Sequence, residues 1–133
     1  KQLQPYHTKA LVLGTGGAYK AVAYVLQQLG IAYTMVSRSP RQGVVSYAML
    51  NAETIKHHLL IINASPVGTF PDINQCPAIP YEAIGERHFL FDLVYNPEKT
   101  LFLKKGEERG AAIQNGYPML IAQAEASWEL WNV

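Results

Sequence analysis

The chain has 133 residues, of which 49% are hydrophobic and 16% are charged, and this balance is typical of one globular domain with a real core. Its net charge of +1 gives no general attraction to nucleic acid or to an anionic membrane surface. The single cysteine, Cys76, excludes a disulfide within the chain and no apolar run approaches the ~20 residues that span a bilayer, so we expect a cytoplasmic protein without a membrane segment.

Apolar runs alternate with helical patterns along the chain. In chain order they predict a strand at 10–13, a helix at 18–29 that ends at Gly30, a strand at 32–36, a short strand at 44–46, a helical turn at 52–56, a strand at 59–63, a loop at 70–80, a strand at 89–94, a helix at 100–109 that ends at Gly110, a short strand at 112–114 and a helix at 119–131. Such alternation favours parallel strands with right-handed crossovers. We therefore expect an α/β fold of the Rossmann type, a doubly wound, mostly parallel sheet with helices on both faces.

A glycine cluster follows the first predicted strand, in the stretch LVLGTGGAYK at residues 11–20. Gly14 and Gly16 match the first two glycines of the dinucleotide motif G-x-G-x-x-G/A, whereas its third position is Tyr19. Glycines let a backbone approach a phosphate closely, and the N–H groups that open a helix attract an anion. A tight strand-to-helix turn without a ligand explains the same residues, so this stretch alone leaves both interpretations open.

The end of the second predicted strand bears on the choice of nucleotide. It reads VSRSP, with Ser37, Arg38 and Ser39 and no carboxylate. An NAD site usually has an acid there for the ribose hydroxyls, whereas a guanidinium offers a planar fork of donors to a 2′-phosphate. A solvated surface arginine is the plain alternative. The position beside the glycine turn, at the same edge of the sheet, favours NADP.

A third stretch, NASPVGTFPD, follows the strand at 59–63 on the same carboxyl edge, where ligands bind in open α/β sheets. Asn63 and Ser65 offer polar groups there, while Pro66 and Gly68 fix a turn of defined shape. An Asx-type turn that merely ends a strand is an equal interpretation of this stretch by itself.

Together with FDLVYNPEKT and NGYPMLIAQA, these three stretches resemble the cofactor-binding domain of shikimate dehydrogenases, in order and over nearly the whole chain. The glycine turn resembles that family's GxGGA loop, and SRS its Asn-Arg-Thr clamp on the 2′-phosphate. NASPVG is similar to its Asn-Thr/Ala-Thr/Ser-Pro-x-Gly loop, and DLVYNP to its Asp-x-x-Tyr-x-Pro segment. The resemblance implies NADP as the cofactor and the reversible reduction of 3-dehydroshikimate to shikimate, a step of aromatic amino-acid biosynthesis.

The resemblance also implies which residues form the site. Its cofactor residues are Gly14, Thr15, Gly16, Gly17 and Ala18 at the pyrophosphate, Ser37, Arg38, Ser39 and Arg41 at the 2′-phosphate, Asn63 and Ser65 beside the adenosine, and Val94, Gly116 and Met119 at the nicotinamide. Its substrate residues are Tyr95 and Gln123. The chain departs from the family pattern at Tyr19, where a small residue is usual, and at Gln42, where a second arginine is common.

The resemblance implies that the catalytic lysine and aspartate belong to an amino-terminal substrate domain that this chain lacks. Residues 1–133 are then the NADP-binding domain, and about 1–8 are the remnant of the connection between the two domains. We expect no metal ion and no turnover by this chain alone, because hydride transfer to a ketone needs a placed proton donor.

Candidate donors within the chain do not meet that need. Tyr95 and Lys99 have the Y-x-x-x-K spacing of short-chain dehydrogenases, but Pro97 would break the shared helix. The adjacent His57 and His58 indicate a solvated pair, and Asp92 indicates a turn.

Two alternatives stay open at this point. One is an NAD-accepting quinate/shikimate dehydrogenase, and the other is a nucleotide-binding redox sensor without catalysis. Monomer and homodimer both fit the sequence.

Overall fold

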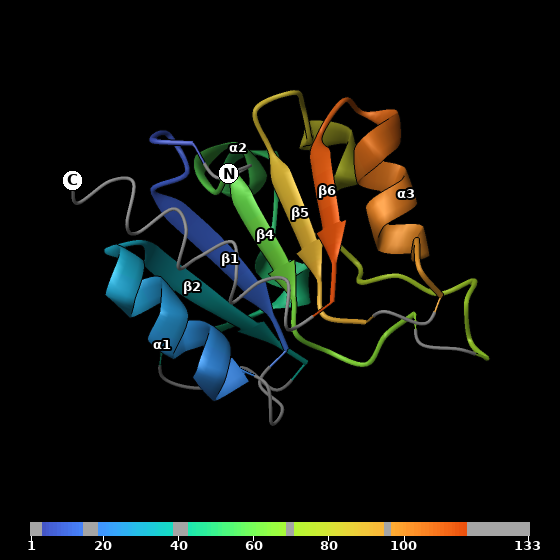
Figure 1. The fold of residues 1–133 in the computed structure, drawn as a ribbon, viewed down its shortest axis with the longest axis horizontal. Coiled ribbons are helices and arrows are strands. Elements are labelled where there is room, and N and C mark those ends of the chain that lie inside the picture. The colour runs from blue at the N-terminus through green and yellow to red at the C-terminus, as the bar shows by residue number, and fades with distance from the viewer. Residues whose placement is uncertain (1–3, 15–18, 39–42, 69–70, 95–96, 117–133) are drawn as a thin grey trace.

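The fold, seen in a computed structural model that describes residues 4–14, 19–38, 43–68, 71–94 and 97–116, is built on one parallel sheet. Its six strands lie in the order β3-β2-β1-β4-β5-β6, and every neighbouring pair is parallel (Figure 1). The strands are β1 (Lys9–Leu13), β2 (Ala32–Ser37), β3 (Val44–Ser46), β4 (Leu60–Asn63), β5 (Phe89–Asp92) and β6 (Ala112–Asn115). The helices of the described residues are α1 (Tyr19–Leu29), α2 (Ala52–His57) and α3 (Leu101–Glu108), with 3₁₀ turns η1 (Tyr47–Met49) and η2 (Tyr81–Ala83).

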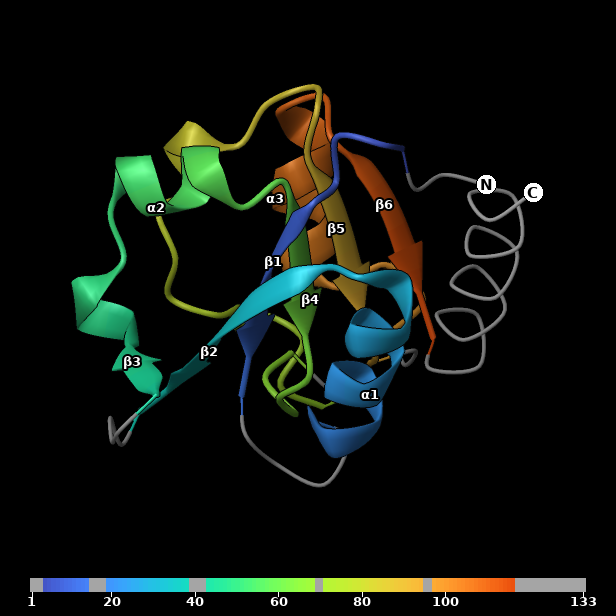
Figure 2. The same ribbon diagram turned by 90° about the vertical axis from the view of Figure 1, so that its left-hand side faces the viewer.

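The sheet separates two cores, because successive side chains of a strand point to opposite faces. On one face, Ala10 and Val12 of β1 pack with Val22 and Leu26 of α1. On the other face, Leu11 and Leu13 belong to the core that α2 and α3 cover. Figures 1 and 2 show these helices on the two sides of the sheet. The expected doubly wound α/β architecture, with helices on both faces, is confirmed.

Strand order reverses beside β1, and this reversal places the site. The chain runs from β1 outward through β2 to β3, then returns through α2 to β4 on the other side of β1. In open α/β sheets, ligands bind outside the carboxyl ends of the strands at such a reversal. The carboxyl ends of β1, β2 and β4 carry the three stretches that the sequence singled out.

Several predicted boundaries differ from the observed ones by one or two residues, and side chains explain two of these differences. The strand predicted to reach residue 94 ends at Asp92, whose Oδ1 accepts a hydrogen bond from the Val94 backbone N–H at 2.9 Å and turns the chain. The helix predicted from residue 100 begins at Leu101, because the Thr100 side chain caps it by accepting from the Leu103 N–H at 3.3 Å. The helix expected at 119–131 lies outside the described residues.

Candidate nucleotide-binding site

The turn after β1 begins at Gly14, in a backbone conformation that favours glycine. Its φ is +99°, and its N–H donates to the carbonyl oxygen of Val36 in β2 at 2.8 Å. A side chain at this position would collide with Ser65, in the loop after β4. Gly14 is therefore bonded to β2 and lies against the loop after β4, and its missing side chain is what allows this close approach.

The loop after β4 is shaped by Asn63, which is fully buried. Its Oδ1 accepts from the Ser65 N–H at 3.1 Å and from the Ser65 hydroxyl at 2.6 Å. Its Nδ2 donates to the Val67 carbonyl at 3.3 Å and to Oδ1 of Asp92 at 3.1 Å. The Asn63 amide is thus engaged within the protein, and the loop presents Ser65, together with Pro66 and Val67, to a cavity.

Asp92 joins this loop to the segment after β5. It is the register partner of Asn63 and is also fully buried. Besides the bonds from Asn63 and the Val94 N–H, its Oδ2 accepts from the Thr100 hydroxyl at 2.6 Å. Burial raises the pKa of Asp92 to about 6, although these three hydrogen bonds oppose the shift. One carboxylate therefore ties together the ends of β4 and β5 and the start of α3.

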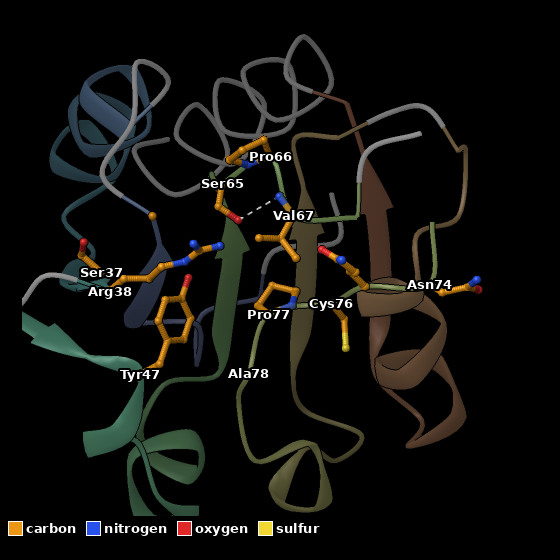
Figure 3. A pocket seen from close by; sticks show the side chains of 12 residues that line it. Ser37, Arg38, Tyr47, Ser65, Pro66, Val67, Asn74, Cys76, Pro77 and Ala78 are labelled. Atoms are coloured by element: carbon orange, nitrogen blue, oxygen red, sulfur yellow. Dashed lines mark hydrogen bonds between the residues drawn. The ribbon is translucent and has the colours of Figure 1, made fainter. Parts of the chain in front are cut away.

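A cavity of about 850 Å³ opens at the carboxyl ends of β1, β2 and β4 (Figure 3). Its described lining residues are Gly14, Ser37, Arg38, Tyr47, Ser65, Pro66, Val67, Asn74, Gln75, Cys76, Pro77 and Ala78. Among them, Arg38 is the one charged side chain, and Figure 3 shows it extended across the cavity toward Ser65. The structure thus brings four of the predicted cofactor residues to one hollow: Gly14, Ser37, Arg38 and Ser65.

Asn63, predicted beside the adenosine, does not line the cavity, because it is buried beneath Ser65 and its amide is bonded within the protein. The remaining predicted residues form two groups. Val94 is buried just after β5, and Gly116, with φ of +88°, donates its N–H to the Asp92 carbonyl at 2.8 Å, so both lie at the same edge of the sheet. Outside the described residues lie Thr15, Gly16, Gly17, Ala18, Ser39, Arg41, Tyr95, Met119 and Gln123.

Sequence reasoning missed two parts of the cavity wall. Tyr47 begins η1 directly after β3, and its place follows from the parallel register of β2 and β3. Residues 74–78 come from the proline-rich loop, which the Tyr81 hydroxyl holds in place by donating to the Pro77 carbonyl at 2.7 Å. Cys76 is a free thiol in this loop.

The expectation of a solvated histidine pair was wrong for His58. Its Nδ1 lies 2.7 Å from the Thr54 carbonyl oxygen and its Nε2 lies 3.2 Å from Oγ1 of Thr34, because the chain turns back toward β2 at the end of α2. The His57 side chain is 66% exposed and its Nε2 lies 3.4 Å from Oε2 of Glu53. Within the described ranges, no three His, Cys, Asp or Glu side chains cluster as metal ligands. No helix in that part of the chain is long and apolar enough to cross a membrane.

Comparison with known proteins gives the family relationship. No family model matches the chain. Shikimate dehydrogenases (NADP⁺) from Halothermothrix orenii and Thermus thermophilus are each 35% identical to it, over 94% and 96% of this chain and 50% of each relative. The chain is similar to shikimate dehydrogenases over nearly all of its own length. It spans about half the length of the curated relatives it matches.

Solved shikimate dehydrogenase structures carry the same fold. The enzyme from Thermus thermophilus in complex with NADP(H) and shikimate superimposes with a TM-score of 0.72 at 32% identity, over 96% of this chain and 50% of that one. A chorismate mutase/shikimate 5-dehydrogenase fusion protein from Clostridium acetobutylicum gives 0.71 at 37% identity, over 93% and 46%. The resemblance read from the sequence is confirmed.

Proposed function

We propose that this chain is the NADP-binding domain of a shikimate dehydrogenase, the enzyme that reversibly reduces 3-dehydroshikimate to shikimate. The observation that carries the proposal is the position of Arg38. It follows β2 and lines the same cavity as Gly14 and Ser65, and no carboxylate is among the described residues that line that cavity. A 2′-phosphate at this place meets a guanidinium, whereas a ribose diol finds no acid to accept from its hydroxyls.

The donor set fits NADP along the edge of the sheet. Arg38 and its flanking serines would hold the 2′-phosphate, Ser65 would contact the adenosine, and residues 14–18 would hold the pyrophosphate. Val94, Gly116 and Met119 then receive the nicotinamide end. When bound, the reduced nicotinamide supplies the hydride.

The remaining parts of the enzyme complete this assignment. Tyr95 and Gln123 contribute to the substrate site, and the lysine and aspartate that move the proton come from a second domain. Residues 1–8 connect the two domains. A cytoplasmic location fits the free thiol of Cys76.

Calorimetric titration of the purified chain tests the cofactor assignment. NADP⁺ is expected to bind more tightly than NAD⁺, and Arg38→Ala is expected to remove most of that difference, because a charge-assisted hydrogen bond contributes roughly 1.5–3 kcal/mol. Lys104→Ala, on the exposed side of α3, removes the same charge away from the cavity and is the matched control. Equal affinities for the two nucleotides in the unaltered chain would contradict the proposal.

A further inference from the structure

Arg38 and Tyr47 lie nine positions apart in the sequence. Arg38 directly follows β2, Tyr47 directly follows β3, and these two strands are paired side by side. β2 and β3 are parallel, and their last register pair is Ser37 with Ser46. Arg38 and Tyr47 are the next residues on these two strands. The parallel register therefore delivers a guanidinium and a phenol side by side to the carboxyl edge of the sheet.

The two side chains also point toward each other within the cavity. Both line the 850 Å³ cavity, and Figure 3 shows the Tyr47 hydroxyl pointing toward the Arg38 guanidinium. The Tyr47 ring is half-buried and packs against the core on the α2 and α3 face, which fixes its direction. Burial raises the pKa of Tyr47, while the positive charge of Arg38 lowers it, so the hydroxyl lies within the field of that charge.

A phenol is suited to this position because it both accepts and donates hydrogen bonds. Toward Arg38 its oxygen is an acceptor for guanidinium N–H groups, and toward a ligand its O–H is a donor. A phosphate dianion bound at Arg38 needs further donors, and no second cation is among the described residues of the cavity wall. The hydroxyl supplies a donor without adding charge.

We propose that Tyr47 is a specificity-determining residue, whose hydroxyl acts with Arg38 as a two-residue clamp for the 2′-phosphate of the nucleotide. The inference rests on the proposed function, since it requires a 2′-phosphorylated nucleotide in this cavity. It assigns to a tyrosine that follows β3 a role that the sequence motif gives only to the SRS stretch at the end of β2.

The test compares two small probes that differ only in the 2′-phosphate, adenosine 2′,5′-bisphosphate and adenosine 5′-monophosphate. Tyr47→Phe keeps the packed ring and removes the hydroxyl. The variant is expected to bind the bisphosphate about tenfold more weakly, the size expected for one lost hydrogen bond to a charged group, and to bind the monophosphate unchanged. Tyr24→Phe is the matched control, because Tyr24 is 63% exposed on α1 and does not line the cavity.

A double-mutant cycle separates the clamp from two independent contacts. If the hydroxyl acts together with Arg38, Tyr47→Phe is expected to cost clearly less in the Arg38→Ala background than in the unaltered chain. Equal costs in both backgrounds would overturn the clamp. Loss of both probes in equal measure would also overturn it, since Tyr47 would then support the adenosine or the fold.

If the proposed function itself is wrong, the binding measurements give a different pattern. In that case the unaltered chain shows no preference for the bisphosphate over the monophosphate. A preference that survives Tyr47→Phe intact overturns the role of Tyr47 and leaves the proposed function standing. Circular dichroism of each variant confirms that the chain is folded before binding is compared.

Discussion

Gly14 and Ser65 lie against each other in the wall of the cavity at the carboxyl edge of the sheet. A Cβ built on Gly14 would lie 2.9 Å from Cβ of Ser65 and 3.0 Å from its backbone nitrogen. Ser65 cannot retreat, because the buried Asn63 holds both its N–H and its hydroxyl. Gly14 and the loop after β4 therefore pack tightly together, and a side chain at position 14 would have to displace that loop.

Replacing Gly14 by alanine is expected to lower the free energy of unfolding by about 2 kcal/mol or more. The left-handed φ of +99° costs of order 1–3 kcal/mol for an L residue, and the collision with Ser65 adds to it. Urea titration measures the change. Gly30→Ala is the matched control, since Gly30 has φ of +72° and nothing within 4 Å of an added Cβ. Equal losses in the two variants would show that the contact with Ser65 contributes nothing.

Much of the fold and part of the site could be predicted because both follow from where strands end. Buried runs such as LVL and LIIN identify strands without tertiary information, and parallel strands share a carboxyl edge. Motif residues that come just after those strands, such as Gly14, Arg38 and Ser65, must then gather at that edge. This is why three separated stretches could be assigned to one nucleotide site.

What could not be predicted depends on contacts between distant segments. The place of Tyr47 depends on the register of β3 against β2, which no local pattern encodes. The loop at 74–78 reaches the cavity because of the Tyr81 hydroxyl bond to Pro77. His58 looked solvated because its partner Thr34 lies on another strand. Each of these residues has an ordinary local sequence and acquires its role only in the assembled fold.

The chain alone is expected to bind NADP⁺ without oxidising shikimate. Two titratable groups near the sheet edge are already engaged: Asp92 accepts three hydrogen bonds in the interior, and Nζ of Lys99 lies 2.7 Å from Oε1 of Glu107. Without a placed base, the substrate hydroxyl keeps its proton. Absorbance at the wavelength of reduced nicotinamide should stay flat with shikimate and NADP⁺. Steady turnover that survives repurification would mean that a catalytic group has been overlooked.

Two buried histidines make the stability of the domain sensitive to acid. In His7, Nδ1 accepts from the Gln4 N–H at 2.9 Å, so Nε2 carries the proton and donates to the Arg87 carbonyl at 2.8 Å. His88 repeats the arrangement, accepting from the Gly85 N–H at 3.0 Å and donating to the Ile55 carbonyl at 2.8 Å. Both rings must be neutral, because a protonated Nδ1 would face an N–H group.

Burial lowers the pKa of both His7 and His88 from the ordinary value of 6.5. The unfolded chain therefore binds more protons just below pH 6.5, and stability that is present above that pH is lost as the pH falls. Urea titration at pH 7.5 and 5.5 should show the loss. The loss should be smaller in the double variant His7→Gln, His88→Gln, which is less stable at pH 7.5 but no longer carries the two buried imidazoles. An unaltered loss in the double variant would assign it to other groups.

Asp92→Asn tests the carboxylate that joins the loops after β4 and β5. The amide oxygen of the variant can still accept from the Asn63 side chain and from the Val94 N–H. Its N–H₂ group, however, faces the Thr100 hydroxyl, which in the unaltered chain donates its proton to the Asp92 carboxylate. Leaving a buried polar group unpaired costs roughly 1–3 kcal/mol, so the variant should be less stable and should bind NADP⁺ more weakly.

The pH dependence of the difference in stability between the wild type and Asp92→Asn shows whether the titration of Asp92 contributes to it. Since burial raises the Asp92 pKa from 3.8 to about 6, the folded chain holds a proton that the unfolded chain has lost between these values. Wild-type stability therefore declines with rising pH across that window relative to the variant, and the gap between the two narrows. Unfolding titrations at pH 4 and 7 measure the gap, with Thr100→Ser, which keeps the hydroxyl, as the control expected to track the wild type. A gap that widens toward pH 7 would mean that the ionised carboxylate is favoured by folding, and that its three donors outweigh the cost of its burial.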